Sequence, residues 1–484
     1  MQCLTPNQPS FSGGVEHRLE QLAARAAWEM ACIEAEAPVW LKKPEDDAHY
    51  NVVIVGGGLN GLSAAFALRR RGIEGVFVID QAEAGCEGPW ITSARMKTLR
   101  SPKTLAGPDF GIPSLSPRAW YETVYGAETF AGLEKIGRED WMRYMLWFRK
   151  ASGVTVHNET RLEAVAEAES GVRLKISGAA TPPREITCRR LIMANGMDGC
   201  GGPYVPDNVR ALAKQFWTHS AEVTDDSHLN GKDVIVLGSA TSSFDWAVTA
   251  LEAGARRVTM VARAKALACT EALAWTNFPG YLGSFAELPD DEKWRFLQHY
   301  YDLKVPPTQD QYDRATSYAN FVMELGSGVA SLAIEDGRIR AETKNGTIHA
   351  DHILLGTGYG VDFSMRPELA SLAGRFARWR DRYAPPEGED CQTVLQAPYL
   401  GRTFELTPMD AVQDRWVSRI HMFNGGAVPS LGPVSNGITG VKYGIARIAD
   451  GMTRAFFLED AAHFQEKLAN YREQHFNPRD KISA

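Results

Sequence analysis

A glycine-rich turn between an apolar run and a helix-forming stretch constrains the fold of this chain more than any other feature. Residues 51–55 (Asn-Val-Val-Ile-Val) form a continuous apolar run of the kind found in buried parallel strands. The turn at residues 56–61 (Gly-Gly-Gly-Leu-Asn-Gly) follows, residues 62–72 favour a helix, and residues 75–80 favour a second strand. This order of elements predicts a nucleotide-binding β–α–β unit.

The residues of this turn have the sizes that a bound dinucleotide requires. Gly56 permits a tight turn, Gly58 leaves room for a pyrophosphate at the backbone, and Gly61 allows helix and strand to pack closely. The N-terminus of the helix offers free N–H groups to the phosphates. Asp80 follows Gly61 by 19 residues, at the end of the second strand, where a carboxylate accepts hydrogen bonds from ribose hydroxyls. We therefore predict a site for FAD or NAD here, with a ligand-free glycine turn as the alternative.

A second unit of the same kind lies near the middle of the chain. Its apolar run is followed by Gly238, with Ala240 and Ser243 at the second and third glycine positions, where small side chains still admit a pyrophosphate. The next strand ends at Arg263, where an NAD site carries an acid, and a guanidinium there makes forked bonds to a 2′-phosphate. With Lys265 nearby, this unit predicts NADPH rather than NADH. The alternative is a repeat without ligand, in which Arg263 is a surface residue.

The two units predict an α/β fold with two Rossmann-like dinucleotide-binding domains, the NADPH domain being inserted in the FAD domain. Apolar residues at helical spacing between residues 15 and 35 predict an N-terminal helix that packs against the body or a second copy of the chain. Short strands are expected between residues 154 and 194, with Pro182 and Pro183 in a turn. The expected segments are an N-terminal helical extension at 1–50, a FAD-binding domain at 51–213 and 354–450, an NADPH-binding domain at 214–353 with a helical insertion at 270–325, and a C-terminal tail at 451–484 that follows a helix at 441–457.

Composition and charge exclude several classes of protein. Among 484 residues, 59 are acidic and 52 basic, giving a net charge of −7, which argues against a nucleic-acid or membrane-surface binder. No apolar run approaches the ~18 residues of a membrane span, and residues 2–14 lack the apolar core of a secretory signal. We therefore expect no nucleic acid and no membrane as partners, and leave a homo-oligomer open.

The seven cysteines are scattered and include no Cys-x-x-Cys pair. This pattern predicts reduced thiols in a cytoplasmic protein rather than a disulfide framework. Neither the cysteines nor the eleven histidines have the spacing of metal ligands, so we predict no metal site.

Further short motifs follow the first turn in a characteristic order. They are Gly88-Pro-Trp90, Met96-Lys-Thr-Leu-Arg-Ser-Pro102, His219-Ser220 and, after the second turn, Leu355-Gly-Thr-Gly358. In this order, and over about residues 50–450, the chain resembles the class B flavoprotein monooxygenases, which comprise flavin-containing monooxygenases, amine N-hydroxylases and Baeyer–Villiger enzymes. The resemblance implies that NADPH reduces FAD, that O2 adds at the flavin C4a position, and that the resulting (hydro)peroxide passes an oxygen atom to a small organic substrate. Because the cofactor carries this chemistry, no catalytic triad or acid–base pair is required.

Three positions depart from the family pattern. Ala213 and Gln215 replace the Phe and Gly expected before His219, and Val223 replaces the Trp expected in Baeyer–Villiger enzymes. The resemblance therefore favours N-hydroxylation of an amine over Baeyer–Villiger oxidation of a ketone, with S-oxygenation as a further alternative. A non-oxygenating FAD/NADPH oxidoreductase and a redox sensor stay open, although a disulfide reductase would need the cysteine pair that the sequence lacks.

Arg100 and Trp90 are the two candidate catalytic residues. Arg100 lies between apolar neighbours and would hold a substrate carboxylate or the nicotinamide cofactor, whereas the resemblance places Trp90 at the flavin edge, with core packing as its alternative. The loop that ends in Ser435-Asn-Gly437 precedes the last helix and suits the flavin pyrimidine carbonyls. His219 has either a structural role or a contact with NADP⁺. The small residues Gly356-Thr-Gly358 would let the chain pass under FAD.

The residues predicted to bind the cofactors all lie in these motifs. They are Gly56, Gly58, Leu59, Asn60, Gly61, Asp80, Gln81, Gly88, Pro89, Trp90, Met96, Leu99, Arg100, His219, Gly238, Ser239, Ala240, Thr241, Ser242, Ser243, Arg263, Lys265, Gly356, Thr357, Gly358, Ser435, Asn436 and Gly437. A separate aromatic stretch would form either a substrate lid or, as we favour, part of the core. Its members are Trp275, Phe278, Tyr281, Phe285, Trp294, Tyr300 and Tyr301.

Overall fold

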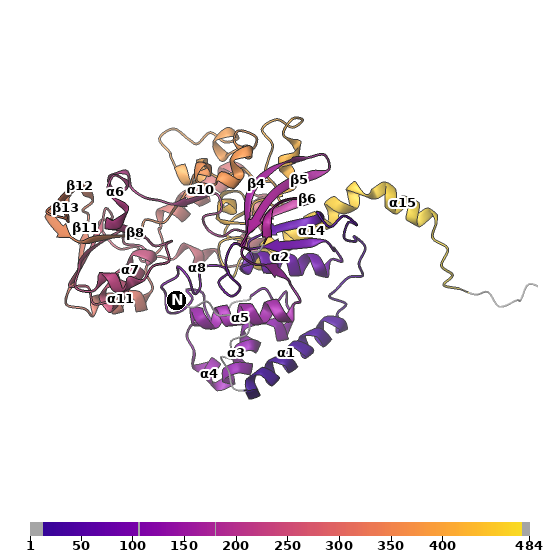
Figure 1. Ribbon diagram of the computed structural model, residues 1–484, viewed down its shortest axis with the longest axis horizontal. Coiled ribbons are helices and arrows are strands. Elements are labelled where there is room, and N and C mark those ends of the chain that lie inside the picture. Colours follow the sequence, from indigo (N-terminus) through magenta and orange to yellow (C-terminus); the bar gives the residue numbers. More distant parts are fainter. Residues whose placement is uncertain (1–12, 105–106, 180, 477–484) are drawn as a thin grey trace, which may run out of the picture.

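The computed structural model describes residues 13–104, 107–179 and 181–476, in two bodies that lie side by side along the long axis of the molecule (Figure 1). Each body is built around a sheet that carries one of the two glycine turns. The middle of the chain forms the second body, and segments on either side of it form the first. The predicted α/β fold with two Rossmann-like units is confirmed.

The first body contains a seven-stranded sheet in the order β3-β2-β1-β6-β5-β4, with β17 also paired to β6. The strands are β1 (His49–Val55), β2 (Val76–Ile79), β3 (Val156–His157), β4 (Thr160–Ala168), β5 (Gly171–Gly178), β6 (Thr181–Met193) and β17 (Ile420–His421). The pairs around β1 are parallel, whereas β4, β5 and β6 form an antiparallel meander. β1 lies between β2 and β6, which explains why residues 51–54 of its apolar run are buried.

One expected turn is wrong. β6 begins at Thr181, so Pro182 and Pro183 lie at the start of this strand rather than in a turn. Proline lacks a backbone donor and is tolerated at the first positions of a strand. The register between β5 and β6 is irregular at this end, between Ile176 and Gly178, which removes the need for a regular ladder there.

Helices cover the first sheet, and two of them frame the first glycine turn. α2 (Leu59–Arg70) starts at the turn and packs against α14 (Val441–Glu459). The predicted N-terminal helix is α1 (Gly13–Cys32), which packs against α3 (Pro117–Tyr125). Further helices of this body are α4 (Ala127–Gly132), α5 (Arg138–Ala151), α12 (Gln392–Leu395) and α13 (Val428–Leu431).

The second body contains a parallel five-stranded sheet in the order β11-β10-β9-β15-β8. The strands are β8 (Trp217–His219), β9 (Asp233–Leu237), β10 (Arg257–Ala262), β11 (Phe321–Leu325) and β15 (His352–Leu355), and β12 (Val329–Glu335), β13 (Arg338–Thr343) and β14 (Gly346–Ala350) form a separate antiparallel sheet. α7 (Thr241–Glu252) follows the second glycine turn, α11 (Gln309–Thr316) packs against it, and α6 (Asp207–Arg210) lies near β12.

The expected helical insertion is divided between the two bodies. α8 (Ala272–Thr276) and α9 (Pro279–Ser284) lead to α10 (Asp290–Asp302), and Tyr281, Phe285 and Trp294 are buried in the core of the first body. α11 returns to the second body, and residues 321–325 form strand β11 rather than a helix. Phe321 packs there against Phe244 of α7, so the aromatic pattern that suggested a helix comes from core packing instead.

Two short paired strands lie where the chain passes between the two bodies. β7 (Gly201–Pro203) and β16 (Tyr359–Val361) pair antiparallel with each other, Gly201 opposite Val361. Added Cβ atoms on Gly201 would lie 1.9 Å from the carbonyl oxygen of Gly360. The two crossing segments therefore pack with their backbones in direct contact.

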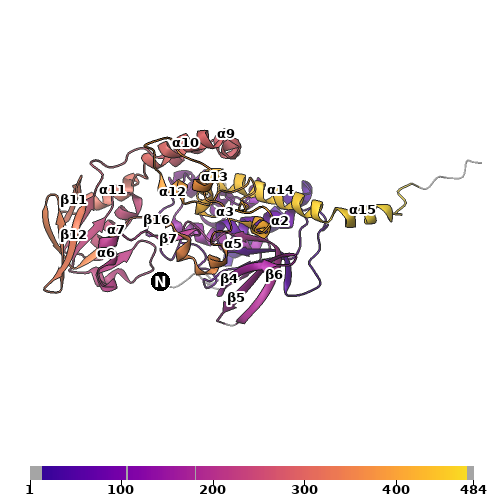
Figure 2. The same cartoon turned by 90° about the horizontal axis from the view of Figure 1, so that it is seen from above.

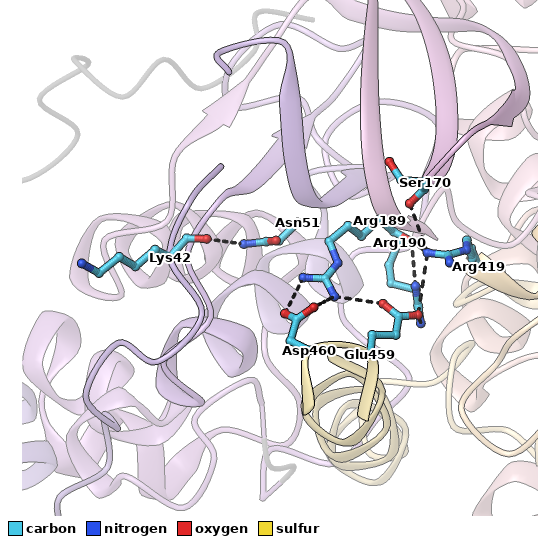
Figure 3. Close-up of polar contacts among 8 residues, drawn as sticks. All are labelled: Lys42, Asn51, Ser170, Arg189, Arg190, Arg419, Glu459 and Asp460. Carbon is cyan, nitrogen blue, oxygen red and sulfur yellow. Dashed lines mark hydrogen bonds and ion pairs between the residues drawn. The ribbon is translucent and has the colours of Figure 1, made fainter. Parts of the chain in front are cut away.

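The expected C-terminal tail is helical over its first part. α14 continues to Glu459, and α15 (Ala461–Ala469) extends away from the body (Figure 2). At the junction, Arg189 of β6 donates to Asp460 at 2.9 Å and to Glu459 at 3.0 Å, and Arg190 donates to Glu459 at 2.5 Å (Figure 3). These partly buried ion pairs fix the end of α14 on the first sheet.

Two sequence expectations concern cysteines and membranes. Cys32, Cys188, Cys200, Cys269 and Cys391 are free thiols, but Cys86 is disulfide-bonded, so the expectation of reduced thiols throughout is wrong at Cys86. Within the described part of the chain, every helix is too short or too polar to cross a membrane.

Candidate active site

The first glycine turn is shaped by close backbone contacts. Gly56 has φ +109°, and an added Cβ would lie 2.4 Å from the carbonyl oxygen of Ala194. A Cβ on Gly61 would lie 1.8 Å from the carbonyl oxygen of Gly56. Gly58 differs, because the nearest atom to its added Cβ is 3.8 Å away, in Gly88. The turn therefore needs Gly56 and Gly61 for its own packing and leaves the face of Gly58 open.

The N-terminus of α2 is free to bind an anion. Among the described residues, none accepts a hydrogen bond from the backbone N–H groups of Gly58, Leu59 or Asn60, and the N-cap residue Gly58 has no side chain to do so. A small pocket lies against this turn, and Trp90 and Arg149 help to line it. Unpaired N–H groups beside a cavity fit the diphosphate of FAD.

Asp80, which is predicted to accept hydrogen bonds from a ribose, is held in place by the first glycine turn. Its Oδ2 accepts from the N–H of Gly57 at 2.7 Å, and its Oδ1 accepts from the N–H of Ala82 at 2.8 Å. Burial raises the pKa of Asp80, against the lowering effect of these two hydrogen bonds. Each oxygen keeps a further lone pair, so the carboxylate can still accept from ribose hydroxyls. Gln81, next to it, is exposed.

A buried polar network beside Asp80 escaped the sequence analysis. Glu87 is only 4% exposed and accepts from Arg149 at 2.7 Å and from Asn158 at 2.6 Å. Arg149 lines the cavity at the first turn, so this network orders one wall of the site. No local motif marks it, because its members come from distant parts of the chain.

Trp90 packs in the core, the alternative that we considered, and its place at the flavin edge stays a prediction. It lines the cavity at the first turn and packs edge-on against buried Trp141, with ring centroids 6.0 Å apart. Gly88 and Pro89 before it are exposed, and Leu99 is buried, with its N–H donating to the carbonyl of Ile136 at 2.8 Å. Leu99 therefore anchors the segment in the first body rather than offering a side chain to a ligand.

The loop before α14 is tied to the first turn through Asn60. Its amide donates to the carbonyl oxygens of Phe423 at 3.1 Å and Ser435 at 2.8 Å, so the Asn60 side chain holds this loop. The Ser435 hydroxyl donates to the carbonyl of Asn424 at 2.7 Å. Asn436 follows, and its Oδ1 is buried with no hydrogen-bond partner among the described residues. A buried amide oxygen without a partner beside this turn fits contact with a bound cofactor.

The second glycine turn uses a different pair of small residues. Gly238 has φ +112°, and the Ser243 hydroxyl donates to the carbonyl of Gly356 at 3.3 Å. A Cβ on Gly356 would lie 2.2 Å from Ser243 Oγ, so Gly356 lies against the second turn and not under the first, where we expected it. Thr357 and Gly358 bond to Tyr204, in the segment that leads to the second body.

The start of α7 resembles the start of α2. Within the described ranges, the backbone N–H groups of Ser239, Ala240 and Thr241 have no acceptor, and the N-cap residue Ala240 makes no side-chain cap. The Thr241 hydroxyl donates to Gln311 at 3.0 Å, and the half-buried Ser242 adds no bulk to the turn. This arrangement fits a second diphosphate.

Arg263 and Lys265 lie at the end of β10, where both are exposed. Their stems pass close to Gly328 and Gly326, which leave room for them. Neither has an ion-pair partner in the part of the chain that the structure describes. Two unpaired cations at the strand end fit a 2′-phosphate.

His219 is buried, and both of its ring nitrogens have partners within the protein. It is 1% exposed, its Nδ1 accepts from the N–H of Ala221 at 3.0 Å, and its Nε2 lies 3.1 Å from the carbonyl oxygen of Gly358. Burial lowers its pKa, so the ring is neutral at pH 7. This geometry favours the structural one of the two roles that we considered.

The segment from Arg95 to Arg100 joins the two bodies. Arg95 lies 3.5 Å from the Trp246 ring centroid and pairs with Asp226, and Lys97 pairs with Glu252. Met96 between them is half-buried against the first core. Met96, Leu99 and Arg100 of this segment are predicted to bind a cofactor, and the segment connects the first body to the second.

Arg100 lies between the two turns and forms an ion pair with Glu271, the N-cap residue of α8. Burial raises the pKa of Tyr300 to about 12, with Asn436 and Arg100 lowering it and Glu271 raising it, so these four side chains are close neighbours. Burial likewise raises the pKa of Asp245, on α7, to about 6, against the charge of Arg100. Arg100 therefore lies near α7, which follows the second turn, and near the loop before α14, which Asn60 ties to the first turn.

The sequence analysis missed Glu271, Tyr300 as a site residue, and Asp245. Each lies on a helix far from Arg100 in the chain, and no spacing rule connects them. The aromatic stretch was a partial signal, because Tyr300 belongs to it. Its other members separate, with Trp275 60% exposed and Trp294 buried.

Comparison with known proteins finds one matching family model and one closely related protein sequence. A family model described as pyridine nucleotide-disulphide oxidoreductase matches residues 53–275, which span both turns. The chain is 36% identical over 430 residues to an FAD-dependent urate hydroxylase from Xanthomonas campestris pv. campestris, covering 88% of this chain and 90% of that protein. The chain belongs to the class B flavoprotein monooxygenases. It is an enzyme of the flavin-dependent monooxygenase type, and the resemblance in its motifs is confirmed.

Solved structures agree with this monooxygenase fold. The ornithine hydroxylase of Pseudomonas aeruginosa has a TM-score of 0.65 at 15% identity, over 84% of this chain and 99% of that one. The cadaverine monooxygenase of Erwinia amylovora, solved with FAD, has a TM-score of 0.63 at 16% identity, over 84% and 94% of the two chains. At these identities the likeness concerns the fold of the monooxygenase alone.

Proposed function

We propose that this monooxygenase uses FAD and NADPH to add one oxygen atom from O2 to a small anionic nitrogen heterocycle of the urate class. The observation that carries the proposal is Arg100, a guanidinium between the two nucleotide turns with Asn436 and Tyr300 beside it. A planar anion is the ligand that such a fork binds best. The identity with a urate hydroxylase over most of both chains supports the same substrate class.

In this proposal the chain's residues hold and orient both cofactors. The turn of Gly56, Gly58 and Gly61 and the N-terminus of α2 bind the diphosphate of FAD, and Asp80 accepts from its ribose. The second turn, with Arg263 and Lys265, binds NADPH. FAD supplies the activation of O2 when it is bound, and NADPH supplies the electrons.

The residues around Arg100 would position the substrate. Arg100 binds the anionic edge, and Tyr300, with its raised pKa, keeps its hydroxyl proton at neutral pH and can donate it to a carbonyl oxygen. The unpartnered Oδ1 of Asn436 can accept from a ring N–H of the substrate or the flavin. These groups require a polar, planar molecule with both donors and acceptors.

N-hydroxylation of an amine is the second candidate. The carboxylates of Glu271 and Asp245 near Arg100 would bind an ammonium group, and the solved relatives of this fold include an ornithine hydroxylase and a cadaverine monooxygenase.

We also propose the domain limits expected from the sequence, with α9 and α10 assigned to the FAD-binding domain because their side chains are buried in its core.

The test is substrate-dependent NADPH oxidation by the FAD-loaded protein. Urate, ornithine, lysine, cadaverine and a thioether are compared, with hydrogen peroxide measured to correct for uncoupled turnover and ¹⁸O2 used to trace the oxygen in the product. We expect urate to stimulate oxidation most, and NADPH to be preferred to NADH at least tenfold, since a 2′-phosphate contact of about 1.4 kcal/mol gives that factor. Stimulation by amines alone would replace this proposal with the second candidate.

A further inference from the structure

The guanidinium of Arg100, which the proposed substrate would bind, is already paired with Glu271. Arg100 comes from the first body, whereas Glu271 begins the short helix α8. Their side chains are 25% and 27% exposed, so the pair is open to solvent on one side. The pair is therefore not part of a sealed core.

Glu271 makes a second contact that gives it a fixed place. Its Oε1 accepts from the N–H of Leu273 at 3.2 Å, while its Oε2 accepts from Arg100. Helix α8 is short, from Ala272 to Thr276, and Trp275 on it is exposed against Phe278 and Phe296. Glu271 thus connects this helix to Arg100.

A carboxylate on a guanidinium fork and a planar anion on the same fork are alternatives. Arg100 has five N–H donors, and its Nη2 donates to the Oε2 of Glu271. Asp245 is the other carboxylate in its field, but the Asp245 Oδ1 accepts from Gln311 at 2.6 Å, which keeps it on α7. Glu271 is therefore the carboxylate that an incoming anion would replace.

We propose that Glu271 is a specificity-determining residue that occupies Arg100 in the free enzyme and is displaced from it by an anionic substrate. This inference rests on the proposed binding of an anion at Arg100. It adds that anions must compete with Glu271, whereas neutral molecules gain nothing from displacing it. Freed from Arg100, Glu271 keeps its bond to the N–H of Leu273, so α8 is not unfolded by the exchange.

The test measures binding of urate and of benzoate, a planar monoanion, to FAD-loaded protein by titration calorimetry. We expect Glu271→Gln to bind both anions about threefold to tenfold more tightly than the wild type, because the competing charge is gone while the amide can still cap α8. Arg100→Met in the Glu271→Gln background should lose this gain. Glu122→Gln, which breaks an exposed pair with Arg118 on α3, is the matched control and should change nothing.

The outcomes separate this inference from the proposed function. Tighter benzoate binding by Glu271→Gln, with no urate-dependent NADPH oxidation in any variant, would support the role of Glu271 and reject urate as substrate. Equal or weaker binding of both anions by Glu271→Gln would overturn the role of Glu271, whatever the substrate is. For turned-over anions, a lower KM with unchanged kcat is the expected kinetic signature.

Discussion

The third small position of each glycine turn shows how one requirement is met in two ways. In the first turn Gly61 faces the carbonyl of Gly56, and no side chain fits. In the second turn Ser243 stands at that position, and the missing Cβ belongs to Gly356 on the opposite strand end. The close approach is conserved between the two turns, but the glycine that permits it is on a different segment.

Replacement of Gly61 and Gly58 by alanine should separate folding from cofactor binding. In Gly61→Ala the new Cβ meets backbone at 1.8 Å, so we expect a loss of about 1–3 kcal/mol of stability together with loss of FAD. In Gly58→Ala the nearest atom is 3.8 Å away, so the apoprotein should stay stable while FAD binding weakens tenfold or more. The ratio of flavin absorbance to protein absorbance measures the bound FAD, and thermal melting of the apoprotein measures its stability.

Gly58 is the informative position of this pair. A Gly58→Ala protein that retains FAD as tightly as the wild type would show that the diphosphate does not approach the turn there. Gly111→Ala offers no control, because its φ of +78° strains any side chain, whereas Gly132→Ala lies in open space on α4 and serves as one.

At the residue scale the sequence predicts positions better than partners. The spacing from Gly61 to Asp80 led correctly to an acid at the end of β2 beside the turn. It gave no sign that the Asn60 side chain would hold the loop at Ser435, because that contact joins segments far apart in the chain. For the same reason Glu271 could not be connected to Arg100.

Among the elements, the short segment from Arg95 to Arg100 connects the first body to the second. Arg95 is 10% exposed, stacks on Trp246 and donates to Thr224 at 3.1 Å and to the carbonyl of Glu222 at 3.2 Å. All of these partners belong to the second body. A single side chain from the first body is therefore embedded in the second.

Arg95→Met should loosen the contact between the bodies. The substitution leaves Asp226 without its buried partner and removes the stacking on Trp246, so we expect a loss of roughly 3 kcal/mol. The KM for NADPH should rise while the affinity for FAD stays the same, because the first turn is untouched. Steady-state kinetics and FAD titration test this expectation, with Arg118→Met, in an exposed pair, as the control. Equal losses for both cofactors would contradict it.

Element prediction succeeded where periodicity and burial agree. The strands at β1, β9, β13 and β15 and the helices α1 and α10 follow their apolar patterns closely. The aromatic residues near β11 have helical spacing in the sequence and predict a helical insertion there, which is wrong for residues 321–325. The parallel pairing of β11 with β10 that makes it a strand is a long-range contact and has no local signature.

At the scale of the whole molecule, buried neutral histidines set the response to acid. His352 starts β15 in the second sheet, bonds to Thr218 at 2.8 Å, and has its pKa lowered by burial from 6.5 to about 4. Between these values the unfolded chain binds a proton that the folded chain does not, so stability falls as the pH drops from about 6.5 to 4.

This histidine should account for about 3 kcal/mol of the loss over that interval. We expect His352→Asn to flatten the pH dependence of urea unfolding by that amount, since asparagine keeps a hydrogen-bonding group and does not titrate. The measurement compares the free energy of unfolding of both proteins at pH 7 and pH 4.5. Parallel curves for the two proteins would show that His352 is already protonated in the fold.

The order of the two nucleotide units was visible in the sequence, but their attachment to each other was not. Apolar runs and glycine turns are local features, and they located both sheets. The aromatic side chains of α9 and α10 carry no mark of which core they enter, because both cores are apolar and the choice depends on the path of the connecting chain.

The division of the inserted helices has a practical consequence for dissecting this enzyme. A fragment cut at residues 214 and 353 would carry α9 and α10 away from their place and present Tyr281, Phe285 and Trp294 to water. The remainder would in turn keep an open hollow where those rings had been. We therefore expect neither fragment to fold on its own, and we expect an exchange of the proposed NADPH-binding domain between relatives to fail when it is spliced at these two points alone.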